Sequence, residues 1–388
     1  MTAPSDVNAA ASEAYAALAR GDARSAKELL DKILAVQPSN SGLWLAKAAA
    51  ATALGANDER LEAIDRALAI DPSSLQALIA KADYLTEASD LRGASAYYRT
   101  ALRYMPRFAQ LPAAAQQGLL RAKAATERVA RELEDFVRAR LDAEGISDDR
   151  ASARFGRAVD VLLGRKKAYV QEPRYFFFPE LPNIQFYERH DFPWMDRVEA
   201  ATAIVREELM AVIGGDFSPY VTKTLGRPQG DERGLINNPN WSAYFLRKNG
   251  ADQPGAALCP RTLDALSEAP LTTIPGRAPS VLFSKLAAGA QIPPHTGMIN
   301  ARLICHLPLI VPEGCEFRVG NDVRAWSEGK VWAFDDTIEH EAFNRSAADR
   351  YILIFDIWRP ELSDAERAGV VALCTAIDSY NGASDWDA

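Results

Sequence analysis

The chain of 388 residues has few cysteines and histidines, four of each, and no long apolar run. The four cysteines are scattered and form no CxxC pair, which excludes a disulfide framework and favours a reducing compartment. No stretch reaches the roughly 18 consecutive apolar residues of a membrane-spanning helix. The N-terminus also lacks the basic start and apolar run of a secretory signal. We therefore expect a cytoplasmic protein that has no membrane segment.

Basic charge is also scarce, because 44 Lys and Arg residues face 52 Asp and Glu residues, which gives a net charge of −8. Nucleic acids and anionic lipid surfaces are bound through an excess of Lys and Arg. Neither is therefore an expected partner. The hydrophobic share of 48% and the charged share of 25% are ordinary for globular proteins and exclude a disordered, collagen-like or coiled-coil chain.

The first third of the chain has a repeat of 34 residues, marked by Pro38, Pro72 and Pro106. This period is typical of helix–turn–helix units of the tetratricopeptide type. A large apolar residue stands eight positions before each proline: Leu30, Ile64 and Tyr98. Residues 7–106 therefore resemble three tetratricopeptide repeats, although Arg60 breaks a column of alanines, and a generic alanine-rich bundle is the alternative. Such repeats usually bind peptides or protein partners.

Residues 107–150 are predicted to form a helical cap or linker that ends near Gly145. The clearest helical spacing of apolar residues lies in its second half: Val129, Leu133, Phe136, Val137 and Leu141. A terminal repeat must cover its apolar face, and this stripe is expected to do so.

Residues 170–388 are predicted to form a β-rich sandwich or barrel, because short strand-like runs alternate with turn residues. The expected strands are residues 243–247, 280–287, 301–311, 315–319, 329–334 and 350–358. Helices are expected at 195–214 and at 362–379, where Ser363 and Glu366 have the spacing of a capping box.

Two histidines, His295 and His340, follow predicted strands, and two strand ends can direct two imidazoles at one metal ion. In the run ARLICHLPLIV, the period of two places Arg302, Ile304 and His306 on one face of a strand. Cations on an inward face indicate an anionic ligand, because an unpaired buried charge is costly. Arg350 begins the last predicted strand, and its planar fork suits a carboxylate.

These segments together resemble the aspartyl/asparaginyl β-hydroxylase family. The resemblance is carried by PHTG (294–297), ARLICHLPLIVPEGC (301–315), WSEGKVWAFDDTIEHEAFN (326–344), Arg350 and FDIWRPEL (355–362). It covers about residues 170–375 and implies a double-stranded β-helix (jelly-roll) dioxygenase that uses Fe(II), 2-oxoglutarate and O2. The multidomain chain would then join an all-α tetratricopeptide-like solenoid to a jelly-roll domain.

The resemblance also implies roles for single residues. His295 and His340 would be the metal ligands, with Gly297 where related folds have a carboxylate. Ser284 and Arg350 would bind the far carboxylate of 2-oxoglutarate. His306 would contact its metal-proximal end, with a buried histidine bonded to the backbone as the alternative. Arg302 would hold the substrate's carboxylate, with a structural ion pair to Asp335, Asp336 or Asp356 as the alternative. Asp336 would orient water at the metal.

The expected reaction is hydroxylation of an Asp or Asn side chain of a protein or peptide that the repeats recruit. Ile304 stands where the family commonly has a second arginine, which leaves a non-catalytic scaffold as an alternative. Gly297 leaves room for a halide, so a halogenase is another. A hydroxylase of a lipid or small molecule is the third.

Overall fold

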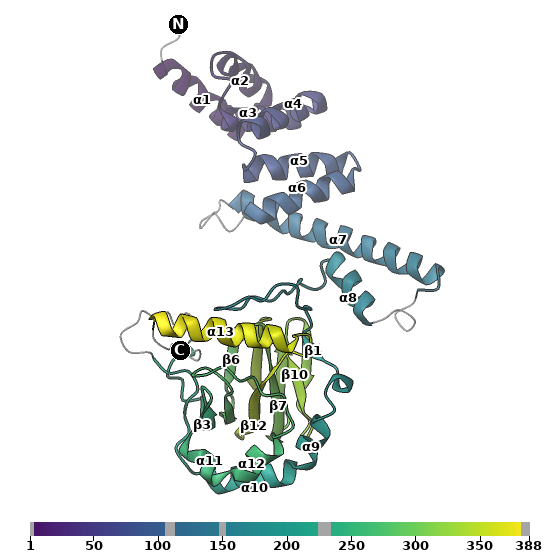
Figure 1. The fold of residues 1–388 in the computed structure, drawn as a ribbon. Helices are drawn as coiled ribbons and strands as arrows, with labels where there is room; N and C mark the ends of the chain where they lie inside the picture. Colours follow the sequence, from purple (N-terminus) through teal and green to yellow (C-terminus); the bar gives the residue numbers. More distant parts are fainter. Residues whose placement is uncertain (1–3, 105–112, 147–152, 224–233, 382–388) are drawn as a thin grey trace. The chain divides into compact units, whose positions relative to one another are not determined.

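The computed structural model describes residues 4–104, 113–146, 153–223 and 234–381. The chain divides into two compact units, residues 1–163 and 164–388. Within the described residues, the first unit is helical and the second contains all the strands (Figure 1). No helix in these described ranges has both the length and the apolarity needed to cross a membrane.

Residues 4–104 form three successive pairs of helices, which confirms the predicted helical repeat. The helices are α1 (Pro4–Ala19), α2 (Ala23–Val36), α3 (Ser41–Leu54), α4 (Asn57–Ile70), α5 (Leu75–Glu87) and α6 (Leu91–Tyr104). Pro38 and Pro72 follow the ends of α2 and α4, because a proline cannot continue a helix. Pro106 lies outside the described residues.

The large apolar residues at equivalent positions of the three repeats form part of the core of the first unit. Leu30, Ile64 and Tyr98 are all buried. Gly21 and Gly55 join paired helices with φ of +81° and +69°, a conformation that favours glycine. Arg60, which breaks the alanine column, is buried as well, and its guanidinium is ion-paired with Glu87 of α5.

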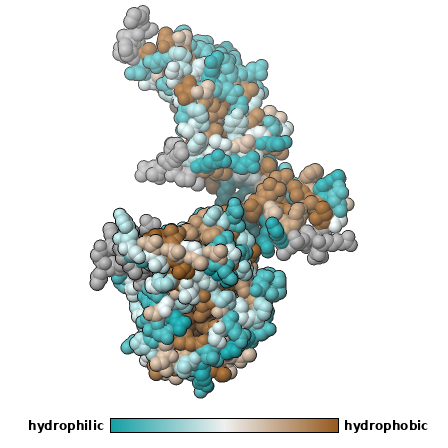
Figure 2. Space-filling model, viewed as in Figure 1, coloured by the Kyte–Doolittle hydropathy of each residue, from teal (hydrophilic) through white to brown (hydrophobic). Residues whose placement is uncertain are grey.

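Two further helices, α7 (Ala113–Ala143) and α8 (Ala153–Leu162), complete the first unit. The prediction of a long helix is confirmed, but the predicted stripe is only partly buried, with Val129, Val137 and Leu141 of intermediate exposure. Leu119 and Ala122 are the buried positions, whereas Leu133 and Phe136 are 51% and 70% exposed. The reason is length, since α7 has 31 residues and the neighbouring α5 and α6 have only 13 and 14. Apolar surface therefore remains visible along the second half of α7 (Figure 2).

The second unit contains two antiparallel sheets, as the predicted sandwich requires. The larger has the order β1-β10-β7-β12-β5-β3-β2, with β4 also paired to β3, and the smaller has the order β6-β11-β8-β9. The strands of the larger sheet are β1 (Phe186–Tyr187), β2 (Ser218–Pro219), β3 (Trp241–Lys248), β4 (Ala251–Asp252), β5 (Val281–Leu286), β7 (Arg302–Ile310), β10 (Trp332–Phe334) and β12 (Arg350–Trp358). Those of the smaller sheet are β6 (Gln291–His295), β8 (Cys315–Val319), β9 (Asp322–Ala325) and β11 (His340–Asn344).

All six predicted strand runs are found as strands, although the run at 329–334 begins only at Trp332. The described residues contain six further strands outside these runs, β1, β2, β4, β6, β9 and β11, and each of them has five residues or fewer. Pro293 and Pro294 are tolerated in β6 because it is an edge strand of its sheet.

Helices cover the outer face of the larger sheet. They are α9 (Met195–Ala200), α10 (Thr202–Val212), α11 (Pro254–Leu258) and α12 (Pro260–Ala265), after a short 3-10 turn at Arg189–Asp191. The single helix predicted at 195–214 is thus broken at Ala201, and both parts pack against the sheet. The last helix, α13 (Asp364–Asn381), has the predicted capping box, in which the backbone N–H of Ser363 donates to Glu366 at 2.8 Å.

The two faces of β7 separate as the period of two predicts. Leu303, Cys305, Leu307 and Leu309 pack with the outer helices. Ile304 belongs to the cluster between the two sheets, and Arg302 and His306 share its side of the strand. The candidate site residues therefore lie in the interior between the sheets.

Candidate active site

Two imidazoles from neighbouring strands form the centre of the candidate site. His295 ends β6 and His340 begins β11, and the two residues are paired across these antiparallel strands. Their ring centroids are 4.1 Å apart. The pairing of β6 with β11 therefore brings together two histidines that are 45 residues apart in the sequence.

Backbone carbonyls orient both rings in the same way. The Nδ1 atom of His295 is 2.8 Å from the carbonyl oxygen of Pro293, and the Nδ1 atom of His340 is 3.1 Å from that of Ile338. A hydrogen bond at Nδ1 places the proton there and leaves the Nε2 lone pair for a metal ion. Burial and the neighbouring His295 hold the pKa of His340 well below its ordinary value, so this ring is neutral at pH 7.

Arg350 lies in the same interior and lacks the partners that a buried guanidinium needs. It is 1% exposed, and its Nε and Nη1 atoms make no hydrogen bond among the described residues. Its contact is the ring of Trp326, 4.9 Å from the guanidinium carbon. Burial lowers the pKa of Arg350 to about 10, which still leaves it charged at pH 7. The arrangement therefore fits an anion that comes from outside the chain.

Ser284 lies on β5, the strand next to Arg350 in the sheet, and is fully buried. Its hydroxyl accepts a hydrogen bond from the indole N–H of Trp241 at 3.3 Å. The Trp241 ring also lies 5.7 Å from that of His295. Trp241 thus contacts both Ser284 of the candidate anion site and the histidine pair, a role that was not predicted from the sequence.

His306 is enclosed by aromatic rings. Its centroid lies 4.8 Å from that of Phe334 and 5.0 Å from that of Phe317. Burial, and after it the charge of Arg350, hold its pKa well below the ordinary value. The Nδ1 atom of His306 makes no hydrogen bond within the described part of the chain. A neutral ring of this kind can donate or accept one hydrogen bond at a ligand.

Arg302 has two carboxylate partners inside the protein. Its Nη2 atom lies 3.6 Å from Asp336 Oδ2, and its Nη1 atom lies 3.6 Å from Asp356 Oδ2. Of the structural pairs considered from sequence, those with Asp336 and Asp356 occur, whereas Asp335 pairs with Arg359 at 2.9 Å. The sequence indicated no role for Asp356 beyond this ion pair. A carboxylate within the apolar run RYILIFDIW is unusual and could have indicated a buried polar site.

Asp336 fills the space beside Gly297. A Cβ atom at position 297 would lie 2.0 Å from Asp336 Oδ2, so this backbone position excludes any larger residue unless Asp336 moves. The backbone N–H of Gly297 also donates to the carbonyl oxygen of Asp336 at 2.7 Å. Burial raises the pKa of Asp336 to about 7, although the charge of Arg302 opposes this shift. Asp336 is thus an acidic side chain next to the segment that follows His295, and it comes from the loop between β10 and β11.

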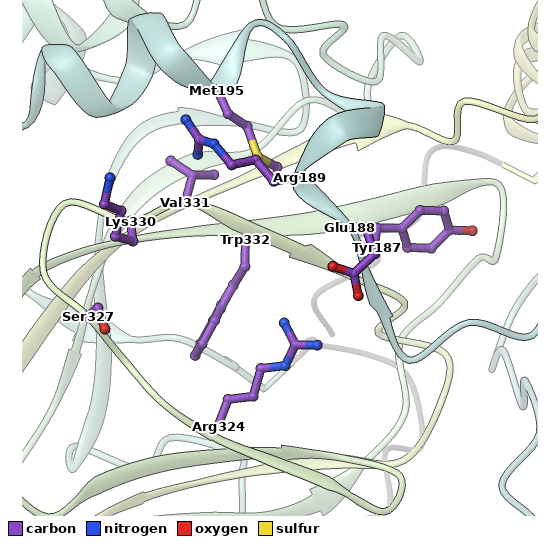
Figure 3. Close-up of a pocket in the computed structure, with 9 residues that line it drawn as sticks. All are labelled: Tyr187, Glu188, Arg189, Met195, Arg324, Ser327, Lys330, Val331 and Trp332. Carbon is purple, nitrogen blue, oxygen red and sulfur yellow. The ribbon is translucent and has the colours of Figure 1, made fainter. Parts of the chain in front are cut away.

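A surface pocket lies elsewhere on the second unit and contains none of the predicted site residues (Figure 3). Its lining residues are Tyr187, Glu188, Arg189, Met195, Arg324, Ser327, Lys330, Val331 and Trp332. Two of its cations, Arg189 and Lys330, are ion-paired with Glu199. This pocket therefore adds nothing to the histidine site.

The described residues contain no cluster of three or more His, Cys, Asp or Glu side chains arranged to hold a metal ion. His295 and His340 are the two imidazoles that the fold brings together at this site. Imidazole suits iron among other transition metals. The four cysteines are buried and none of them forms a disulfide with another.

Two facing antiparallel sheets with a histidine pair between them are typical of double-stranded β-helix oxygenases. The family model described as Aspartyl/Asparaginyl beta-hydroxylase matches residues 199–360. The C-terminal unit of this chain is therefore a domain of the aspartyl/asparaginyl β-hydroxylase family, whose members depend on Fe(II) and 2-oxoglutarate.

Curated relatives match the same region. The human aspartyl/asparaginyl beta-hydroxylase is 34% identical over 44% of this chain and 22% of its own length. The human aspartate beta-hydroxylase domain-containing protein 2 is 31% identical over 51% of this chain and 53% of its own. An ornithine lipid ester-linked acyl 2-hydroxylase of Rhizobium tropici is 32% identical over 48% of this chain and 65% of its own. The chain thus spans between about a fifth and two thirds of these proteins.

Among solved structures, the TPR domain of Sgt2 from Aspergillus fumigatus is similar to 33% of this chain and 83% of that one. The identity is 25% and the TM-score is 0.29. A likeness at this TM-score adds no weight, so the repeat assignment rests on the three helix pairs and their 34-residue period.

Proposed function

We propose that the chain is an Fe(II)- and 2-oxoglutarate-dependent dioxygenase that hydroxylates the β-carbon of an Asp or Asn side chain in a protein or peptide. The proposal rests above all on Arg350. A charged guanidinium that is 1% exposed, with two nitrogen atoms that make no hydrogen bond to any described residue, calls for an anionic ligand. The far carboxylate of 2-oxoglutarate is such a ligand, and the histidine pair, which Trp241 links to Ser284 beside Arg350 in the sheet, is suited to iron.

Each residue of the site would have a distinct task. His295 and His340 would hold Fe(II) through Nε2, since backbone carbonyls occupy both Nδ1 atoms. Ser284 would bind the carboxylate together with Arg350, in an orientation fixed by the indole N–H of Trp241. When bound, Fe(II) and 2-oxoglutarate would supply the oxidising power to hydroxylate a C–H bond with O2.

The remaining side chains would control polarity and water. His306, neutral at pH 7, would offer one hydrogen bond to the other end of 2-oxoglutarate. Asp336 would accept hydrogen bonds from water beside the histidines. The rings of Phe317 and Phe334 would keep bulk water away from this end of the site.

The helical repeats would recruit the substrate or a partner protein. Stacked helix pairs present an extended surface on which a peptide can lie. This part of the proposal would be tested by comparing substrate capture by the whole chain with capture after substitutions on the repeats.

The test of the site is an anaerobic titration with Fe(II) and then 2-oxoglutarate, followed through the weak visible charge-transfer band of the chelate. We expect the band in the wild type and its loss in His340→Ala. Arg350→Ala should need at least about tenfold more 2-oxoglutarate, because it loses charge-assisted hydrogen bonds. His190→Ala is the matched control, since His190 is 80% exposed and lies in the 3-10 turn.

Absence of the band in folded wild-type protein at saturating Fe(II) and 2-oxoglutarate would overturn the proposal. The repeats would then be the functional part, and the chain would act as a binding scaffold.

A further inference from the structure

The surface pocket in Figure 3 is lined by edge strands of both sheets. Tyr187 ends β1, at the edge of the larger sheet, and Arg324 belongs to β9, at the edge of the smaller sheet. The loop between β9 and β10 supplies Lys330, and Trp332 of β10 completes the wall. Because no described strand pairs with the outer edges of β1 and β9, their side chains meet solvent here and leave a cavity of about 180 Å³.

Ion pairs within the chain already hold one wall of this pocket in place. The carboxylate of Glu199 accepts a hydrogen bond from the backbone N–H of Val331 at 3.0 Å. It is also ion-paired with Lys330 at 3.0 Å and with Arg189. The charges of these two cations are therefore matched inside the protein, and the wall that they form does not have to be ordered by a ligand.

Two other charges of the pocket have no counter-charge among the residues that the structure describes. Glu188 is exposed, and its carboxylate makes no hydrogen bond or ion pair with them. Arg324 makes no ion pair with them either, and its guanidinium carbon lies 4.0 Å from the centre of the Phe186 ring. A guanidinium stacked on a ring still has N–H groups along its edge to donate. Figure 3 shows both charged groups extending into the space beside the Trp332 ring.

The rest of the lining combines apolar surface with an unsatisfied donor. The Nε1 atom of Trp332 is buried and donates to no residue in the described ranges, which favours a ligand that brings acceptor atoms. Met195 and Val331 are 1% and 7% exposed and supply apolar contacts. A matching ligand carries an anionic group for Arg324, a cationic group for Glu188 and a small apolar part.

We infer that this pocket binds a small zwitterion, namely a free α-amino acid with a small apolar side chain. Its carboxylate accepts hydrogen bonds from Arg324, and its ammonium donates to Glu188. Its side chain lies against Trp332 and Met195. The size agrees, because the cavity is smaller than the roughly 300–1,000 Å³ of sites for drug-sized ligands. The pocket is separate from the histidine pair, so the inference does not depend on the proposed function.

The test is isothermal titration calorimetry of the full-length, metal-free protein with L-valine as the probe. We expect saturable binding with a Kd of about 1 mM or tighter. L-Valinamide lacks the carboxylate, and N-acetyl-L-valine lacks the ammonium. Each should bind at least about tenfold more weakly than L-valine, because each loses one charge-assisted contact. This comparison uses the wild type and does not depend on the folding of a variant.

Two substitutions should each remove one half of the recognition. Arg324→Gln should weaken L-valine binding at least about tenfold and should abolish the advantage of L-valine over L-valinamide. Glu188→Gln should likewise abolish its advantage over N-acetyl-L-valine. Lys330→Gln is the matched control, because this cation of the same pocket is ion-paired with Glu199 and is 69% exposed. It should leave the affinity within about twofold of the wild type.

A second titration separates this pocket from the candidate co-substrate site, which also attracts carboxylates. L-Valine should bind equally well when Mn(II) and excess 2-oxoglutarate occupy the histidine site. Displacement of L-valine by them would put it at the histidine site and overturn the inference. Absence of saturable binding at about 10 mM L-valine, or equal binding of the three ligands, would also overturn it. None of these results bears on the proposed function, which the Fe(II) chelate band tests by itself.

Discussion

Replacing Arg350 with methionine should make the ligand-free protein more stable, because the structure leaves this charge uncompensated. Each buried donor without a hydrogen bond costs about 1–3 kcal/mol, and the Nε and Nη1 atoms of Arg350 are two such donors among the residues that the structure describes. The contact with the Trp326 ring returns about 1–2 kcal/mol. Methionine has a similar length and fills the space without charge. We therefore expect the free energy of unfolding of Arg350→Met to rise by about 1–3 kcal/mol.

The measurement is urea unfolding of the metal-free protein, followed by tryptophan fluorescence. Six of the seven tryptophans lie after residue 164, so the signal reports mainly on the second unit. Adding 2-oxoglutarate and Mn(II) should stabilise the wild type, by about 2.7 kcal/mol at a hundred times the Kd, and should stabilise Arg350→Met far less. The variant would thus gain stability and lose its ligand.

Arg277 provides the matched control. It is equally buried, at 1% exposed, but its guanidinium is ion-paired with Asp378, with the Nε atom 2.9 Å from Oδ2. Arg277→Met should therefore destabilise the protein, by about 3 kcal/mol, because it leaves Asp378 without its cation. If Arg350→Met destabilised the protein as much as Arg277→Met, Arg350 would be a structural residue and the reasoning would be wrong.

Three further outcomes follow from the packing. Gly297→Ala should cost about 1–3 kcal/mol and weaken metal binding, measured by calorimetry, because its Cβ would displace Asp336; unchanged affinity would contradict this. Burial alone would raise the pKa of Glu208, but hydrogen bonds from two backbone N–H groups and two side chains hold it below its ordinary value. The ionised Glu208 therefore stabilises the fold above about pH 4.3, and this contribution is lost as the pH falls through the folded-state pKa. Glu208→Gln should have a lower free energy of unfolding than the wild type at pH 7. The difference, measured by urea unfolding, should shrink at lower pH. Leu133→Ser should change thermal stability by less than about 0.5 kcal/mol, whereas Leu119→Ala should cost about 2–4 kcal/mol; equal losses would mean that both halves of α7 are packed.

The sequence determined the helical repeat and the β-rich unit because both depend on local periodicity. Prolines at a spacing of 34 residues end helices wherever they occur, and a period of two puts Arg302 and His306 on one face of β7 whatever packs against them. The resemblance to the family could also be recognised from the sequence, because it depends on the motif PHTG and on its spacing from His340 and Arg350.

Only the tertiary structure decided which residues meet. The register of β6 with β11 places His295 against His340, and the loop before β11 puts Asp336 where position 297 can hold only a glycine. The apolar spacing on α7 looked clearest in its second half, but that half holds the exposed Leu133 and Phe136, whereas Leu119 in the first half is buried. The pairing of Arg302 with Asp336 and Asp356 likewise depends on strands and loops far apart in the chain. Burial and charge pairing arise from contacts between distant segments, and no local pattern in a single sequence records them.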